Sequence, residues 1–230
     1  MTDPIQTEVD GEWLKAKGTT LGADNGIGVA TELALLTDDT IEHGPLECLF
    51  TVDEETGLTG AFALKEGFMT GEILLNLDSE DEGELFIGCA GGVDSVAEFN
   101  YHEIDVPAGY FCCKIQVKGL KGGHSGGDIH LGLGNANKIL TRFLSLASQK
   151  YDLYLCDIDG GNLRNAIARE AYAIIAIHEN DKHSLRTDLN IFAAEVQNEY
   201  NVIDPDLQLI MESENFHAKA IDRDTTRRLL

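Results

Sequence analysis

Carboxylates that could bind a metal ion occur at three places in the first third of the chain. Asp24 lies in a glycine-framed turn, and the pair Glu54 and Glu55 directly follows an apolar run. Asp78 follows the next apolar run. In an open α/β sheet, strands end and binding loops begin at such positions. Because converging carboxylates repel one another unless a cation joins them, the pattern predicts a metal-binding hydrolase core.

Each of these residues also has a simpler interpretation. An aspartate such as Asp24, in a turn that leads into a helix, can be an N-cap. Adjacent glutamates such as Glu54 and Glu55 are common on helix surfaces. The residues after Asp78 are typical of a solvated acidic turn and lack the ligand spacing of an EF-hand. The order of the three acidic strings is more informative than any one of them.

Alternation and apolar runs predict the elements that would position these groups. We expect a hairpin over residues 5–16, helices over 26–36 and 57–64, buried strands over 46–52 and 73–77, and one more strand over 84–89. A strand, a short helix and a strand within about 35 residues form a βαβ unit. The first part of the chain is therefore predicted to be α/β.

After Gly92 the pattern changes to that of a sheet with one wet face. We expect strands over residues 93–106, 111–120, 151–158, 171–177 and 207–211, amphipathic helices over 135–147 and 185–196, and a last stretch of fourteen residues that is helical or frayed. Strands on one side and helices on the other make an α+β layer. This predicts two domains, residues 1–92 and 93–230.

Composition excludes several classes of function. The 230 residues are 43% hydrophobic and 25% charged, as in a globular protein, and no apolar run reaches the roughly 18 residues of a membrane span. A net charge of −23 argues against nucleic acid or an anionic membrane as a partner. The five cysteines favour a reducing compartment, so we expect a cytoplasmic protein. Cys112 and Cys113 are adjacent on a predicted strand and should point to opposite faces.

Six strings together resemble a known family, the co-catalytic zinc aminopeptidase-like peptidases that include bacterial aminoacyl-histidine dipeptidases. The strings are residues 18–28 (GTTLGADNGIG), 51–57 (TVDEETG), 76–80 (NLDSE), 88–92 (GCAGG), 118–127 (KGLKGGHSGG) and 163–167 (LRNAI). The resemblance covers most of the chain up to about Glu170 and, more loosely, the remainder. It implies part of a catalytic domain followed by part of a lid, or dimerisation, domain.

The resemblance also implies roles for individual residues. Asp24 would bridge two zinc ions, with a cis peptide bond to Asn25, while Glu55 and Asp78 would each bind one of the ions. Glu54 would be the general base that takes a proton from the attacking water. These roles describe a hydrolase of short peptides, Xaa-His dipeptides among them.

In the lid, the resemblance implies that His124 stabilises the oxyanion, often in the partner subunit's site. It implies that Arg164 and Asn165 bind substrate, and that the lid forms a homodimer. The alternative is that these side chains are buried or serve as caps. Ala168 stands where the family usually has a proline, which would loosen that loop.

The chain departs from the family at the metal ligands. No His-x-Asp string precedes Asp24, and no histidine elsewhere has a ligand context. The resemblance therefore implies the middle of a dipeptidase, without its usual histidine ligands. Carboxylate oxygens alone would suit manganese, cobalt or magnesium as substitutes for zinc.

Two hypotheses follow from these observations. The first is a cytosolic dinuclear zinc dipeptidase, of which this chain is an incomplete part with little or no activity. The second is a non-enzymatic, lid-type dimerisation module that binds a partner and keeps a vestigial acidic metal site.

Overall fold

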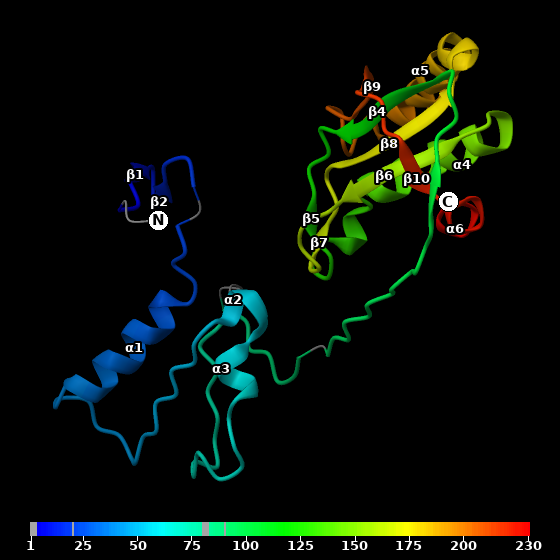
Figure 1. The fold of residues 1–230 in the computed structure, drawn as a ribbon. Coiled ribbons are helices and arrows are strands. Elements are labelled where there is room, and N and C mark those ends of the chain that lie inside the picture. Colours follow the sequence, from blue (N-terminus) through cyan, green and yellow to red (C-terminus); the bar gives the residue numbers. More distant parts are fainter. Residues whose placement is uncertain (1–3, 20, 80–82, 90) are drawn as a thin grey trace. The chain divides into compact units, whose positions relative to one another are not determined.

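The computed structural model describes residues 4–19, 21–79, 83–89 and 91–230, and it divides into two compact units (Figure 1). Unit 1 is Met1–Val93 and unit 2 is Asp94–Leu230. The interpretation of the chain as part of a catalytic domain (1–92) and part of a lid domain (93–230) stays a prediction.

Unit 1 begins with the expected hairpin. Strands β1 (Thr7–Asp10) and β2 (Trp13–Ala16) pair antiparallel, with Asp10 opposite Trp13. The two loop residues are therefore Gly11 and Glu12, one position later than the Asp10–Gly11 pair that the sequence favours. Gly11 has a φ of +65°, a conformation that glycine adopts without a steric penalty.

Helix α1 (Gly26–Thr37) forms where the apolar spacing predicts it. The short helix expected after residue 57 instead starts earlier and is split into α2 (Glu54–Gly57) and α3 (Thr59–Phe62). The split falls at Leu58, which has a φ of 58°. That left-handed conformation cannot continue an α-helix, because it breaks the row of parallel carbonyls.

The three strands expected at residues 46–52, 73–77 and 84–89 are wrong, and so is the βαβ unit built from them. These segments have no regular secondary structure, and most of their apolar side chains are exposed, Ile73 by 84% and Leu85 by 97%. A strand exists only when its backbone N–H and C=O groups pair with a neighbouring strand. Among the described residues of unit 1, only β1 and β2 meet that condition.

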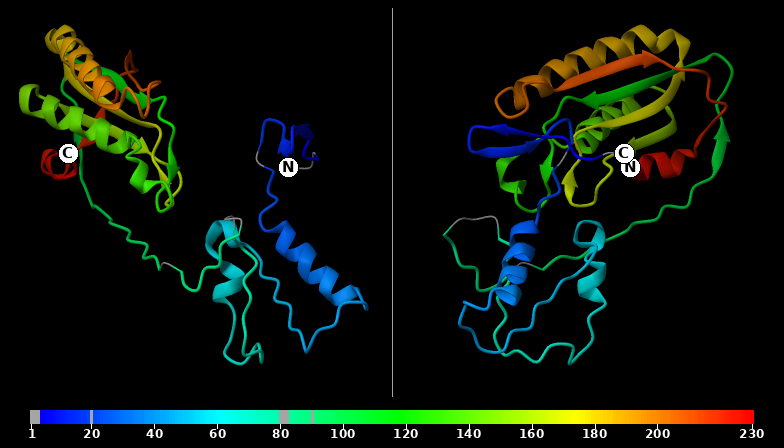
Figure 2. Two further views of the ribbon diagram at one scale, coloured as in Figure 1. Left: turned by 180° about the vertical axis from the view of Figure 1, so that it is seen from behind. Right: turned by 90° about the vertical axis from the view of Figure 1, so that its left-hand side faces the viewer.

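Unit 2 contains a four-stranded antiparallel sheet with strand order β6-β8-β4-β9. The strands are β4 (Tyr110–Lys118), β6 (Tyr154–Gly160), β8 (Ala171–His178) and β9 (Gln208–Ser213). Helices α4 (Ala136–Lys150) and α5 (Lys182–Tyr200) cover one face of the sheet, as Figure 2 shows. The α+β layer expected from the sequence is present.

The main core lies between this sheet and the two helices. Cys113, Ile115 and Val117 alternate into it from β4 and are at most 1% exposed. Helix α4 contributes a stripe at helical spacing that includes Ile139, Leu140, Phe143, Leu144 and Ala147. Its N-terminus is capped by the Asn135 side chain, which accepts a hydrogen bond from the Lys138 amide at 3.2 Å.

Smaller elements complete unit 2. Strand β3 (Glu103–Asp105) pairs with β10 (Lys219–Ile221), and β5 (Gly123–His124) pairs with β7 (Ala166–Ile167). Two 3-10 turns, Ile129–Leu131 and Glu179–Asp181, and helix α6 (Arg223–Leu229) fill the remainder. The long strand expected over 93–106 is thus reduced to three residues, and the last fourteen residues include a strand as well as a helix.

Candidate metal and substrate site

Asp24 does not cap helix α1. The cap is its neighbour Asn25, whose side-chain oxygen accepts a hydrogen bond from the Gly28 amide at 3.0 Å. The capping alternative for Asp24 is therefore wrong, and its carboxylate is available for another role. The Asp24–Asn25 peptide bond is cis, as the resemblance implies.

Glu54 and Glu55 form the first turn of α2. The residue before them, Asp53, has a φ of 60°, and the Thr59 hydroxyl donates a hydrogen bond to the Asp53 carboxylate. This closes the turn at the start of the helix. Asp78 lies in a segment without regular secondary structure, where its amide donates to the Asn76 side chain at 3.1 Å.

The structure brings all four of these acidic residues into electrostatic contact. Partial burial raises the pKa of Glu54, and the negative charge of Glu55 raises it further. The charges of Asp78 and Asp24 add to this effect. Burial also raises the pKa of Asp78, followed by the charge of Asp24 and a hydrogen bond between the two carboxyl groups.

A divalent cation would relieve this repulsion, and carboxylate oxygens are suitable ligands for one. In this chemical sense the residues fit a metal. Among residues 4–19, 21–79, 83–89 and 91–230, however, no group of three or more His, Cys, Asp or Glu side chains is close enough to hold an ion. The carboxylates interact through space without forming a closed coordination shell. Whether Asp24, Glu55 and Asp78 are the ligands stays a prediction.

The lid residues named by the sequence meet through the pairing of β5 with β7. His124 lies opposite Ala166, and the Ser125 amide donates to the Asn165 carbonyl at 2.8 Å. Next to Asn165, the Arg164 guanidinium pairs with Asp94 at 2.8 Å. The side chains of His124, Arg164 and Asn165 are all exposed, so the buried alternative is wrong for all three.

The ring of His124 has a defined tautomer. Its Nδ1 accepts hydrogen bonds from the amides of Gly126 and Gly127, at 3.1 and 3.0 Å. Because an accepting Nδ1 carries no proton, the neutral ring holds its proton on Nε2. A Cβ atom at Gly126 would lie only 3.2 Å from the ring, which explains the glycine there. The exposed His124 ring therefore has an Nε2–H group that can donate a hydrogen bond.

Two aspartates that the sequence analysis did not single out hold the His124 loop. Asp128 accepts a hydrogen bond from the His124 amide at 2.8 Å. Asp204, 1% exposed, accepts from the Lys121 amide and the Gly134 amide, each at 2.8 Å. These two amides lie on either side of the loop, so one buried carboxylate ties both of its ends. Nothing local around Asp204 could have indicated this, because its partners are 70 and 83 residues away.

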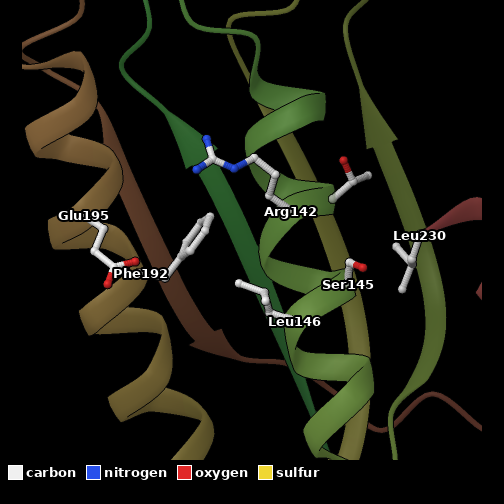
Figure 3. A pocket seen from close by; sticks show the side chains of 7 residues that line it. Arg142, Ser145, Leu146, Phe192, Glu195 and Leu230 are labelled. Atoms are coloured by element: carbon white, nitrogen blue, oxygen red, sulfur yellow. The ribbon is translucent and has the colours of Figure 1, made fainter.

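A separate hollow of about 430 Å³ lies between α4 and α5 (Figure 3). Its lining comes from Thr141, Arg142, Ser145, Leu146, Phe192, Glu195 and Leu230. Arg142 is committed to an ion pair with Glu199 at 3.0 Å. None of the residues predicted to bind metal or substrate lines this hollow, so we assign it no part in the chemistry.

Comparison with known proteins agrees with the sequence analysis. A family model described as "Peptidase dimerisation domain" matches residues 115–204, which lie within unit 2. The chain is 50% identical to the cytosol non-specific dipeptidase of Escherichia coli over 231 aligned positions. It is similar in structure to aminoacylhistidine dipeptidase from Vibrio alginolyticus, with 44% identity and a TM-score of 0.68. The resemblance to aminoacyl-histidine dipeptidases is confirmed.

Both similarities extend over 99% of this chain. The predicted fold class, a mixed helix-and-strand peptidase fold with a dimerisation domain, is confirmed by these similarities. The chain spans about half of each relative, 48% of the Escherichia coli protein and 47% of the Vibrio chain. No helix in the described part of the chain is long and apolar enough to cross a membrane.

Proposed function

We propose that this chain carries part of a metal-dependent peptidase that hydrolyses dipeptides, Xaa-His dipeptides among them, in the cytoplasm. The observation that carries the proposal is the electrostatic coupling of Glu54 with Asp24 and Asp78. Such coupling raises the affinity for a divalent cation at the place where a hydrolase of this type needs one. The similarity to named dipeptidases supports a peptide as the substrate.

Under this proposal Asp24, Glu55 and Asp78 hold the metal, as two zinc ions or as manganese, cobalt or magnesium. A bound cation would polarise the scissile carbonyl and acidify water. Glu54 takes the proton from the attacking water and then gives it to the leaving amine.

The lid residues act on the substrate in the proposal. The Nε2–H of His124 donates a hydrogen bond to the carbonyl oxygen as negative charge develops there. Arg164, assisted by Asn165, binds the substrate's carboxylate. Its pair with Asp94 is exposed on both sides, 64% and 66%, so exchanging one carboxylate for another costs little.

We further infer that the 230 residues alone are weakly active or inactive. Their predicted ligands are carboxylates without a histidine, whereas catalytic zinc usually keeps at least one nitrogen or sulfur ligand. The test measures zinc and manganese binding and β-alanyl-histidine hydrolysis on the purified chain. The variants are Asp24→Asn, Glu54→Gln and, as an exposed control that removes the same charge, Glu66→Gln.

We expect weak, sub-stoichiometric metal binding that Asp24→Asn lowers and Glu66→Gln leaves unchanged. Binding equally strong in Asp24→Asn would show that these carboxylates are not the site. Near two zinc ions per chain, with turnover lost in Glu54→Gln, would show that the chain holds a complete site and would overturn the inference of weak activity.

A second candidate function is a non-enzymatic dimerisation module. The match of residues 115–204 to a dimerisation domain favours it, and it shares with the first proposal the expectation of a homodimer through unit 2. The two differ in peptide binding. Chemical shifts of His124 and Asn165 should move on addition of β-alanyl-histidine if the lid binds substrate, and Arg164→Ala should abolish the change. A dimer with unmoved resonances would favour the module.

A further inference from the structure

A second core in unit 2 brings two cysteines together on the sheet face opposite α4 and α5. Cys112 on β4 and Cys156 on β6 lie on either side of β8. Ala176 on β8 is in register with Cys112 on one side and with Tyr154 on the other, while Cys156 lies at a β-bulge two residues further along β6. Cys112 and Ala176 belong to the same small core, and Cys156 packs against it. Cys113, the next residue on β4, faces the main core instead, as the alternation predicts.

The two thiols contact each other directly. The Cys156 and Cys112 side chains form a hydrogen bond, and the His217 amide donates a second one to the Cys112 sulfur at 3.3 Å. Cys112 is 2% exposed, while Cys156 is partly exposed and lines an open pocket of about 280 Å³ together with His217. An ion can therefore reach the pair from the side of Cys156.

A disulfide does not suit this geometry. The two cysteines are separated by β8, so their Cα atoms lie about 9–10 Å apart, twice the spacing of neighbouring strands. A disulfide needs a Cα separation below about 7 Å. Without a metal ion, burial raises the pKa of the Cys156 thiol to about 12, so the free thiol is a weak nucleophile at neutral pH. A metal ion that binds the sulfur displaces this proton, so the raised pKa disfavours nucleophilic chemistry without excluding a metal site.

A metal ion bound between the two sulfur atoms allows a larger separation of these atoms than a direct S–S bond does. We propose that Cys112 and Cys156 form a two-coordinate site for a soft monovalent metal ion, with Cu(I) as the representative ion. Thiolates select Cu(I), whereas zinc in closed sites takes four ligands. The described part of the chain has no group of three or more ligating side chains around one point, which disfavours zinc here.

The binding step balances without a redox partner. Two S–H bonds release two protons, two S–Cu bonds form, and no electron is transferred when copper is supplied as Cu(I). The site is independent of the proposed peptidase function, because none of its residues is among those predicted to act on peptide.

The test is an anaerobic Cu(I) titration of the full chain against the competing chelator bathocuproine disulfonate. The first variants are Cys156→Ser and Cys112→Ser. The control is the double variant Cys48→Ser/Cys89→Ser, which removes the two cysteines of unit 1. X-ray absorption of the copper-loaded wild-type chain gives the number of sulfur ligands without any substitution.

We expect one tight Cu(I) ion per chain with two sulfur ligands. Loss of either ligand should weaken binding by more than the roughly 10–100-fold that loss of a supporting partner costs. The control should bind as the wild type does. Binding unchanged in Cys156→Ser, binding lost in the control, or a copper ion without two sulfur ligands would each mean adventitious binding only and overturn the proposal. Because Cys156 is partly exposed, Cys156→Ser keeps the test valid even if Cys112→Ser does not fold.

Discussion

Replacing Asp204 should destabilise unit 2 and release the loop that carries His124. The Asp204 carboxylate is 1% exposed and accepts two backbone hydrogen bonds, from Lys121 and Gly134, both at 2.8 Å. Asp204→Ala removes both acceptors and leaves two N–H groups without partners in a buried place. Hydrogen bonds to a charged group contribute about 1.5–3 kcal/mol each, so the expected loss is about 3–6 kcal/mol.

The variant Asp204→Asn should remove only one of the two hydrogen bonds. The amide keeps one acceptor oxygen but presents an NH₂ group to the second backbone donor, so the expected loss is about half as large, roughly 1.5–3 kcal/mol. The matched control is Asp206→Asn, which removes the same charge from an exposed position two residues away and should cost less than about 0.5 kcal/mol.

The assay is urea denaturation followed by circular dichroism. The single tryptophan of the chain, Trp13, lies in unit 1, so its fluorescence reports on that unit and should be unaffected. A loss below about 1 kcal/mol for Asp204→Ala, or one equal to that of the control, would refute the argument, because two unsatisfied buried donors cannot cost so little.

Two further predictions follow. Tyr110 donates a hydrogen bond to Asp152, which raises its pKa to about 12, and burial adds to the shift. The folded chain keeps this proton above pH 10 while the unfolded chain loses it, so stability falls as the pH rises from about 10 to 12. The pKa values of Tyr151 and Tyr172 are also raised, so an ultraviolet titration should show several late tyrosines and one fewer in Tyr110→Phe. In Gly119→Ala the new Cβ would lie 2.1 Å from the Asp206 carbonyl oxygen, whereas Gly109→Ala has a similar positive φ and open space. The Gly109→Ala variant should lose about 1–2 kcal/mol of unfolding free energy because of its left-handed backbone conformation. The Gly119→Ala variant should lose more because of the clash. A Gly119→Ala variant as stable as Gly109→Ala in urea denaturation would contradict the clash.

Local sequence pattern predicted the elements whose stability depends on near neighbours. The hairpin, α1 and both amphipathic helices form where the spacing of apolar residues indicates them, because a turn or a helix is closed by hydrogen bonds over a few residues. The same pattern failed for the strands at 46–52, 73–77 and 84–89, since a strand needs a partner that its own residues do not specify.

By itself, the sequence determined which residue types are present for chemistry and where they cluster along the chain. Asp24, Glu54 and Asp78 stood out through their order along the chain, the first in a glycine-framed turn and the other two after apolar runs. Only the tertiary structure decided that Asn25 rather than Asp24 caps the helix and that the His124 ring carries its proton on Nε2. These outcomes depend on which amide lies within hydrogen-bonding distance of which side chain.

The same holds for contacts between distant parts of the chain. The hydrogen bonds of Asp204 and the contact of Cys112 with Cys156 join residues far apart in sequence. A register shift of one residue in β4 would have placed the Cys112 side chain on the opposite face of the sheet. Sequence spacing predicts the direction of a side chain within one element. Its partners are decided by strand order and register, which exist only once the sheet has formed.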